Sequence, residues 1–167
     1  MAEGQWYDSE RRPGKRRALP LKAYEDLKAF KIYHLDIGLL RVLCEIDPAI
    51  ILDSDAVFRE FTGSLTEQFV LQELQALNPS PSIYYWSEGA TSEVDYLFSC
   101  QNRIIQVEAK AGLNLHAQSL RVFCEKYSLK MAIRTSLKPF HRDGILMNLP
   151  LYEIWNLKEI LADFRNQ

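Results

Sequence analysis

Hydrophobic and polar positions change their period along the chain of 167 residues, and these changes divide it into predicted elements. Between residues 57 and 77, apolar residues recur every three or four positions, which is the spacing of one face of an α-helix. The stretch "NPSPS" at 78–82 supplies the proline and asparagine residues that commonly end a helix. The pattern therefore predicts a long amphipathic helix over 57–77.

Short segments rich in β-branched and aromatic residues follow this helix. The segments 82–87, 93–98 and 103–110 are joined by the turn-length stretches "SEGATS" and "SCQN", which predicts three strands in an antiparallel meander. Residues 115–127 return to a helical period, and residues 129–136 again resemble a strand. Because a strand, a crossover helix and a further strand usually pair in parallel, 103–110 is expected beside 129–136.

The N-terminal part of the chain has a mixed pattern. Residues 1–20 are polar and basic, with "RRPGKRR" at 11–17, and predict a flexible basic tail or linker remnant before a single domain over 21–167. Apolar residues at helical spacing in 21–46 predict a helix and, after a strand-like break at "KIYHLD", a second short helix.

The C-terminal part predicts a late strand or extended piece over 145–155 and a closing helix that starts from Asn156 as its N-cap. The predicted elements alternate between helix and strand along most of the chain. The expected fold class is therefore α/β, with a central mixed sheet flanked by helices and with extra helices at both ends.

Composition narrows the class of protein. Hydrophobic residues make up 47% and charged residues 25%, as in an ordinary globular protein, and the net charge of -2 argues against binding of nucleic acid through bulk charge. The three cysteines, Cys44, Cys100 and Cys124, form neither a CxxC pair nor a complete disulfide framework, which favours a reducing cytoplasm. No apolar run approaches the ~20 residues of a membrane helix, so no membrane partner is expected.

Charged residues interrupt two of the predicted strands. Side chains alternate between the two faces of a strand, so Glu93 and Asp95 are expected on one face and the apolar residues Val94, Tyr96 and Phe98 on the other. In the next strand, Glu108 and Lys110 are expected to share a face. If the two strands pair through the "SCQN" turn, both polar faces can lie on the same side of the sheet.

Two adjacent carboxylates repel one another unless a cation lies between them, and Mg²⁺ prefers oxygen ligands. Asp95 and Glu108 are therefore candidate metal ligands, and Lys110 is a candidate for holding the attacking water. A further acid could come from the long helix, where Glu67 and Glu73 are the candidates. The alternative is a solvated sheet face with crossing ion pairs, which needs no metal.

Three further residues are candidates for binding nucleic acid. Trp86, near a predicted hairpin tip, could stack on bases, although an aromatic strand that packs on helices is the commoner explanation. Arg103 and Arg134 could contact phosphates beside the site, or they could be ordinary surface charges.

A helix glutamate, a strand aspartate and the run "VEAK" together resemble the core of the PD-(D/E)xK nuclease superfamily, in the residues Glu67, Asp95, Glu108 and Lys110. In order, "AFKIYHLDIGLL", "GSLTEQFVLQEL", "YYWSEGATSEVDYLF", "IIQVEAKAG" and "SLRVFCEKY" resemble a prokaryotic domain of unknown function, usually the C-terminal part of AAA-type ATPases. The chain departs from the superfamily pattern in having Val94 where a proline is usual. It also lacks the Gln-x-x-x-Tyr signature, because no tyrosine follows four residues after Gln118.

The resemblance implies a restriction-endonuclease-like α-β-β-β-α-β core and Mg²⁺- or Mn²⁺-dependent hydrolysis of phosphodiester bonds, with DNA favoured over RNA as the substrate. It also implies an ATPase partner, and since the chain has no GxxxxGK[ST] run, the ATPase would lie outside these 167 residues. A homodimer would suit double-strand cleavage. The alternative is a non-catalytic module that binds DNA or protein and regulates an ATPase.

Overall fold

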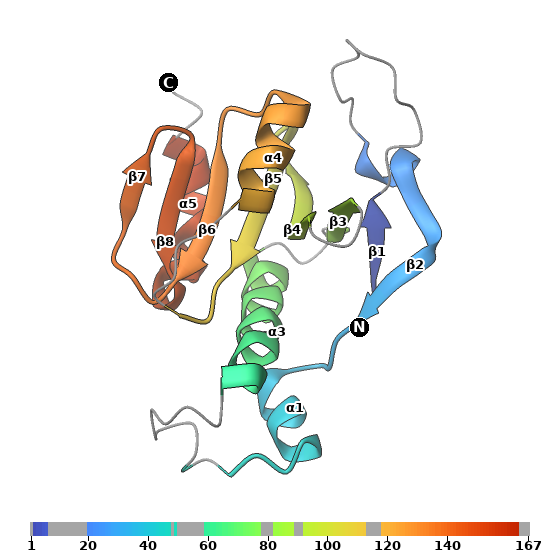
Figure 1. Cartoon of the computed structure of the whole chain (residues 1–167), viewed down its shortest axis with the longest axis vertical. Coiled ribbons are helices and arrows are strands. Elements are labelled where there is room, and N and C mark those ends of the chain that lie inside the picture. The colour runs from blue at the N-terminus through green and yellow to red at the C-terminus, as the bar shows by residue number, and fades with distance from the viewer. Residues whose placement is uncertain are drawn as a thin grey trace.

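The computed structural model of the chain describes residues 2–6, 20–47, 49, 59–77, 82–88, 92–112 and 118–163. Within them, eight strands form one mixed sheet in the order β2-β1-β3-β4-β5-β6-β8-β7 (Figure 1). The strands are β1 Ala2–Trp6, β2 Glu25–Ile32, β3 Tyr84–Glu88, β4 Ser92–Cys100, β5 Arg103–Ala109, β6 Ala132–Ser136, β7 His141–Asp143 and β8 Leu146–Pro150. The strands β3, β4 and β5 form the predicted antiparallel meander, and β6 lies parallel to β5 as expected.

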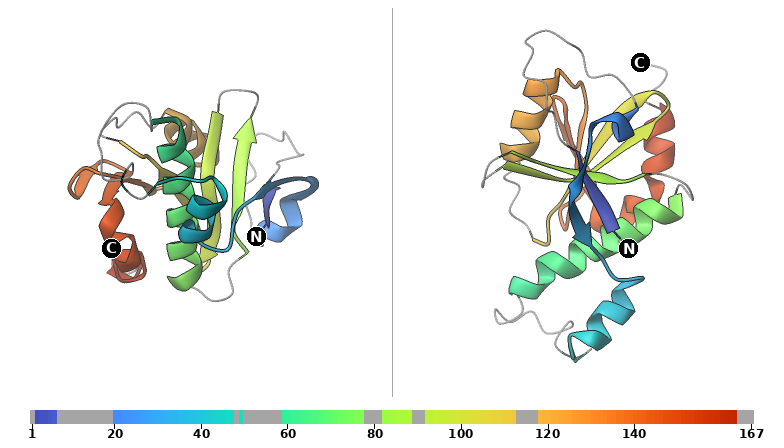
Figure 2. Two further views of the ribbon diagram at one scale, coloured as in Figure 1. Left: turned by 90° about the horizontal axis from the view of Figure 1, so that it is seen from below. Right: turned by 90° about the vertical axis from the view of Figure 1, so that its right-hand side faces the viewer.

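Helices cover both faces of the sheet (Figure 2). The α-helices described are α1 Ile37–Leu43, α3 Arg59–Leu77, α4 Gln118–Tyr127 and α5 Leu157–Asp163, and two short 3₁₀ helices are η1 Leu21–Tyr24 and η3 Leu151–Asn156. The predicted α/β class, with a central mixed sheet flanked by helices, is confirmed. From α3 onward the elements follow the order α3, β3, β4, β5, α4, β6.

Two apolar layers hold the helices to the sheet. On one side, Val70, Leu71 and Leu74 of α3 pack with Val107 and Ile133 in a layer that also includes η3 and α5. On the other side, α4 packs through Leu120, Phe123, Cys124 and Tyr127 against Tyr84, Trp86, Val94 and Leu97. Because both faces are covered, the central strands read as nearly continuous apolar runs, and charged residues within them are conspicuous.

The N-terminal region differs from the prediction. The segment expected to start as a helix forms the short η1 and then the strand β2, and residues Ala2–Trp6 of the expected tail form β1 between β2 and β3. Leu27 and Phe30, whose spacing suggested a buried helix face, are 84% and 59% exposed. Hydrogen bonding to β1 overrides the local pattern, as pairing with distant residues often does. The run "RRPGKRR" lies outside the described residues.

The C-terminal region follows the prediction in part. The expected late strand over 145–155 is β8 as far as Pro150, after which the chain turns into η3 and then α5. Proline lacks the N–H that a continuing central strand would need, so the strand ends there. The three-residue strand β7 has no apolar signal and was not expected. None of the helices in the described ranges has both the length and the hydrophobicity that crossing a bilayer requires.

Candidate functional site

A β-bulge in β4 sets the position of Asp95. Tyr84 pairs with Leu97 and Trp86 pairs with Val94, so the single residue Tyr85 lies opposite both Asp95 and Tyr96. The extra residue changes the alternation of side chains: Val94 packs in the layer of α4, whereas Tyr96 packs in the layer of α3. The prediction that Val94 and Tyr96 share a face is therefore wrong, and the bulge is the reason. Bulges of this kind redirect single side chains and are frequent beside active sites.

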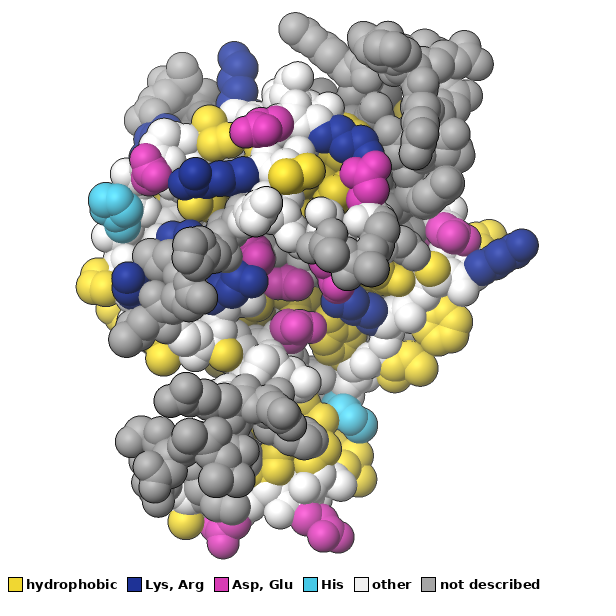
Figure 3. Space-filling model, viewed as in Figure 1, with side chains coloured by type: hydrophobic (Ala, Val, Ile, Leu, Met, Phe, Trp, Pro, Cys, Tyr) yellow, Lys and Arg dark blue, Asp and Glu magenta, His cyan; other side chains and the backbone are white. Residues whose placement is uncertain are grey.

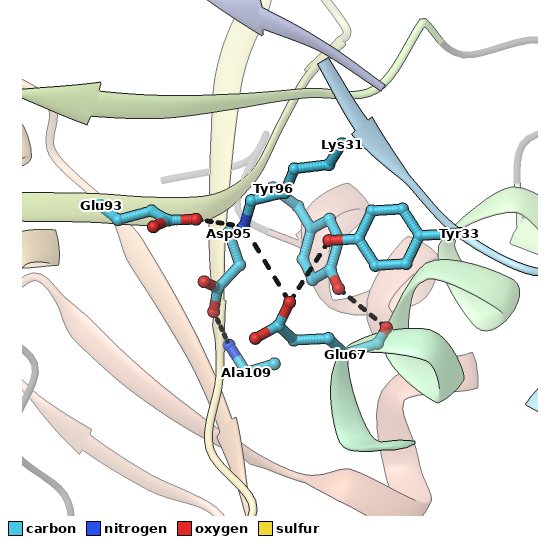
Figure 4. Close-up of polar contacts among 7 residues, drawn as sticks. All are labelled: Lys31, Tyr33, Glu67, Glu93, Asp95, Tyr96 and Ala109. Atoms are coloured by element: carbon cyan, nitrogen blue, oxygen red, sulfur yellow. Dashed lines mark hydrogen bonds and ion pairs between the residues drawn. The ribbon is translucent and has the colours of Figure 1, made fainter. Parts of the chain in front are cut away.

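Asp95 lies where β4 and β5 separate. The last residue pair of the ladder on this side is Tyr96 with Val107, and beyond it the Asp95 carboxylate accepts a hydrogen bond from the backbone N–H of Ala109 at 2.7 Å (Figure 4). The pKa of Asp95 is raised to about 7, mainly by burial and also by the charges of Glu67 and Glu108, while the Ala109 N–H and the charge of Lys31 act in the opposite direction. Both other acids of the predicted set are therefore near enough to repel Asp95.

Glu67 reaches the same place from α3. Its Oε2 accepts a hydrogen bond from the hydroxyl of Tyr33 at 3.3 Å and lies 4.0 Å from the ammonium of Lys31. The hydroxyl of Tyr96 donates to the backbone carbonyl of Glu67 at 2.8 Å, which fixes this turn of the helix against the bulge. In Figure 4 the Glu67 carboxylate points toward Asp95, whose own carboxylate points to the backbone N–H of Ala109. The other helix candidate, Glu73, is six residues further along and so about 240° around the helix axis.

Lys31 of β2 is a member of this cluster that sequence reasoning missed. Its ammonium forms an ion pair with Glu93, lies near Glu67 and stands 5.1 Å from the centroid of the Tyr85 ring. Burial lowers the pKa of Lys31, but the bond to Glu93 and the charges of Glu67, Glu93 and Asp95 outweigh it, so the pKa rises. The alternation of "KIYHLD" places Lys31 and Tyr33 on one face, which was the available signal.

Amide side chains of α3 hold the segment that carries Lys31 and Tyr33. Gln68, which is 1% exposed, accepts from the backbone N–H of His34 at 2.9 Å and donates to the carbonyl of the same residue at 3.0 Å. Gln72, one turn further on, accepts from the backbone N–H of Ile37 at 3.2 Å. A pair of bonds to one residue fixes both its position and its direction, so β2 leaves the sheet on a defined path over α3.

Glu108 and Lys110 form the second half of the site. Glu108 is 4% exposed, and its Oε1 lies 2.7 Å from the ammonium of Lys110. Its other oxygen, Oε2, is buried and has no hydrogen-bond partner within the part of the chain that the structure describes. Arg134 lies beside Glu108 in the parallel register of β5 and β6. Burial lowers the pKa of the Arg134 guanidinium and the charge of Glu108 opposes that shift.

The two parts of the site, Glu67 with Asp95 and Glu108 with Lys110, meet at the end of the sheet where β4 and β5 separate. Glu108 follows Gln106, whose amide contacts Cys124 of α4, and therefore projects from the α4 side of β5. Asp95 instead enters the gap between β4 and β5 and bonds to Ala109, the residue between Glu108 and Lys110. In Figure 3, Asp and Glu side chains gather near the middle of the face, around the end of β5 and the adjoining part of α3, with Lys and Arg side chains beside them.

The residues predicted to bind nucleic acid are distributed differently. Trp86 is 2% exposed, and its ring packs edge-on against Phe123 at 4.9 Å, so its faces are not available to bases and the stacking prediction is wrong. Arg103 is exposed at the start of β5, five residues before Glu108 and so ~17 Å along the strand. Arg134 is buried next to Glu108 and is the residue of the three that lies at the acid cluster.

Whether these residues could hold a divalent cation depends on the carboxylate oxygens that they offer. Among the described residues, no three His, Cys, Asp or Glu side chains already converge as a metal cage. Two carboxylate oxygens are nonetheless on offer, the buried Oε2 of Glu108, which has no hydrogen-bond partner among the described residues, and the oxygen of the half-buried Asp95 that Ala109 does not use. Mg²⁺ is commonly held by one or two carboxylates, with water and phosphate as its other ligands. Asp95 and Glu108 therefore supply donor atoms of the kind that this mode of binding uses.

The sequence matches the family described as a domain of unknown function, DUF4143, over residues 62–154. This range covers more than half of the chain, and the chain belongs to that family. It includes α3, the meander, α4, β6 and β8, and hence Glu67, Asp95, Glu108 and Lys110. A search of curated proteins and a search of solved structures each found no match.

Proposed function

We propose that the chain is a nuclease-like domain that hydrolyses phosphodiester bonds of DNA with the help of Mg²⁺ or Mn²⁺. The observation that carries the proposal is the electrostatic repulsion between the acidic residues of the site. Asp95 has a pKa of about 7 because it is buried beside Glu67 and Glu108, and one buried oxygen of Glu108 has no hydrogen-bond partner among the described residues. Buried carboxylates that repel one another are arranged for a cation, and a lysine lies next to them.

The order of the elements supports the same proposal. The series α3, β3, β4, β5, α4, β6 has the same order of helices and strands as the α-β-β-β-α-β core expected from the resemblance, and the four motif residues lie on α3, on β4, on β5 and just after β5. A fold by itself does not define an activity, so the residues at the site carry the argument. By the same resemblance, the domain would work alongside an AAA-type ATPase.

Each residue then has a role that follows from its position. Asp95 and Glu108 would hold the divalent cation, and Glu67 would support it directly or through water. When bound, the cation supplies Lewis-acid activation and neutralises charge on the phosphate. The Lys110 ammonium, held 2.7 Å from Glu108, would orient the attacking water and stabilise the negative charge that develops on the phosphate.

The test uses the full chain with single-stranded DNA, double-stranded DNA and RNA, in Mg²⁺, in Mn²⁺ and in EDTA. We expect cleavage of DNA with either metal and loss of cleavage in Asp95→Asn and Lys110→Met. Matched controls are Glu159→Gln and Lys158→Met, both on exposed positions of α5, and these should cleave like the wild type. Absence of cleavage of every substrate with both metals would overturn the enzymatic proposal.

A second candidate function is a non-catalytic module that binds DNA or protein and regulates an ATPase. One observation favours it: Lys31 and Lys110 already pair with acids of the cluster, so a metal is not required to neutralise these charges. Titration calorimetry separates the two candidates. Mn²⁺ binding that disappears in Glu108→Gln supports the nuclease, and DNA or partner binding without any metal binding supports the module.

A further inference from the structure

Lys31 brings a positive charge to the acid cluster from outside the matched segment 62–154. It lies on β2, and its ammonium pairs with Glu93 and stands 4.0 Å from Glu67 Oε2. In Figure 4 the Lys31 ammonium lies between the carboxylates of Glu93 and Glu67 and next to Asp95. A cation of this chain is therefore already present among the acids that a divalent cation would approach.

The position of Lys31 is fixed by the surrounding structure. The paired bonds between Gln68 and His34 hold the backbone three residues away, and the Tyr33 hydroxyl bonds to Glu67 itself. The ring of Tyr85, 5.1 Å from the ammonium, lines one side of its position. An exposed lysine loses side-chain entropy when it adopts one geometry, but here the backbone and the aromatic neighbour already restrict it.

We propose that Lys31 is an internal counter-ion that competes with a divalent cation for the carboxylates of Glu67 and Asp95, and thereby sets the metal affinity of the site. The inference rests on the proposed function, since it concerns the same site. It does not rest on the acid cluster alone, because Glu108 also offers a buried Oε2 that accepts no hydrogen bond from the described residues. Lys31 approaches from the α3 side, whereas Glu108 projects from the α4 side, so the ammonium does not pair with that oxygen.

Electrostatics gives the sign and the size of the effect. An ammonium repels a divalent cation bound several ångströms away, and it also withdraws part of the negative charge that attracts the cation. Removal of one such charge in a partly solvated site should tighten metal binding by about fivefold. The effect should weaken as ionic strength rises, because salt screens charges at this separation.

The experiment measures Mn²⁺ affinity by titration calorimetry on the full chain. Lys31→Met should bind Mn²⁺ about fivefold more tightly than the wild type. Lys31→Arg keeps the charge and should bind like the wild type, and Lys28→Met removes an exposed charge from the same strand and should also change nothing. Glu93→Gln releases Lys31 toward Glu67 and Asp95 and should weaken binding. Circular dichroism and thermal unfolding of each variant show whether it is folded.

The outcomes separate the inference from the proposed function. If the wild type binds Mn²⁺ and Lys31→Met binds it equally or more weakly, the role of Lys31 is overturned and the metal site stands. If neither protein binds Mn²⁺, both are overturned. Should Lys31→Met fail to fold, the opposite shift expected for Glu93→Gln, whose side chain is 45% exposed, decides the question. An unchanged affinity in that variant would overturn the inference.

Discussion

The Asp95 carboxylate accepts the backbone N–H of Ala109 at 2.7 Å, at the point where the ladder between β4 and β5 ends. A side-chain oxygen thus takes the place of a main-chain acceptor. This bond keeps the carboxylate between two separating strands and next to both Glu108 and Lys110. The same burial that holds Asp95 there makes its ionised form costly, which gives the protein a measurable dependence on pH.

Without metal, we expect Asp95 to make the free energy of unfolding fall as the pH rises from 4 to 7. The pKa of Asp95 is raised to about 7 in the folded chain, against an unfolded value near 3.9. The contribution of Asp95 to stability is therefore fully present below the unfolded pKa and is lost as the pH rises through about 7. The slope from this group should approach 1.4 kcal/mol per pH unit, about the value of one proton. Urea unfolding in EDTA at several pH values measures it.

Asp95→Asn is the variant that isolates this contribution, since an amide does not titrate. The difference in stability between it and the wild type should grow with pH across the same interval. Asp143→Asn, at an exposed position of β7, serves as the control and should follow the wild type. A wild-type profile parallel to that of Asp95→Asn would show that Asp95 does not titrate in this range.

Substitutions of an acid and of the lysine should affect metal affinity and cleavage differently. Glu108→Gln removes a proposed metal ligand and should lower Mn²⁺ affinity by tenfold or more, together with cleavage. Lys110→Met should keep Mn²⁺ binding within a few-fold of the wild type and lower cleavage by 10²-fold or more, as removal of a group that stabilises the transition state does. Calorimetry and a DNA cleavage assay with the same preparations give both quantities. Equal loss of both in Lys110→Met would mean that the lysine only supports the metal.

Gln68→Ala should destabilise the fold by about 2–4 kcal/mol, because it leaves the partly buried backbone N–H and carbonyl of His34 without these partners. Gln72→Ala, which removes one bond at 3.2 Å from a half-buried position, should cost about 1 kcal/mol. Gln75→Ala on the same helix is the control and should be near neutral. Urea unfolding measures the three variants, and equal effects of Gln68→Ala and Gln75→Ala would contradict the role of Gln68.

Trp86→Ala should lower stability by about 3–5 kcal/mol, the usual cost of removing a large buried aromatic side chain. Trp86→Phe, which keeps an aromatic contact with Phe123, should cost much less. Neither change should alter DNA affinity when the protein is folded, because the ring is covered. Fluorescence anisotropy with labelled DNA checks this. Weaker DNA binding by folded Trp86→Phe would show that Trp86 contributes to binding nucleic acid.

The strands and helices from α3 to β6 could be predicted from sequence because each carries its own period and its own turn residues. The acids also stood out, since Glu67, Asp95 and Glu108 interrupt segments that are otherwise apolar. The relation between Val94, Asp95 and Tyr96 could not be predicted. One inserted residue leaves the sequence pattern of a strand almost unchanged and yet reverses the side to which its side chains point.

The N-terminal strands could not be predicted for a different reason. β1 is short and polar in sequence, and β2 has apolar residues at spacings that suit a helix. They become strands through pairing, β2 with β1 and β1 with both β2 and β3. Lys31 was missed with them, because its role depends on where β2 meets α3. Trp86 shows the opposite error: its sequence position suggested an exposed tip, whereas the contact with α4 buries it.

The anchoring of His34 and Ile37 by Gln68 and Gln72 bears on how the protein could be shortened. A fragment trimmed to residues 62–154 would retain Glu67, Asp95, Glu108 and Lys110 but lose the ribbon of β1 and β2. Strand β3 would then become a bare border of the sheet, open to association with other molecules. The ribbon thus acts as a cover for the sheet and as the carrier of a charge, so that solubility and ion binding of such a fragment would change together.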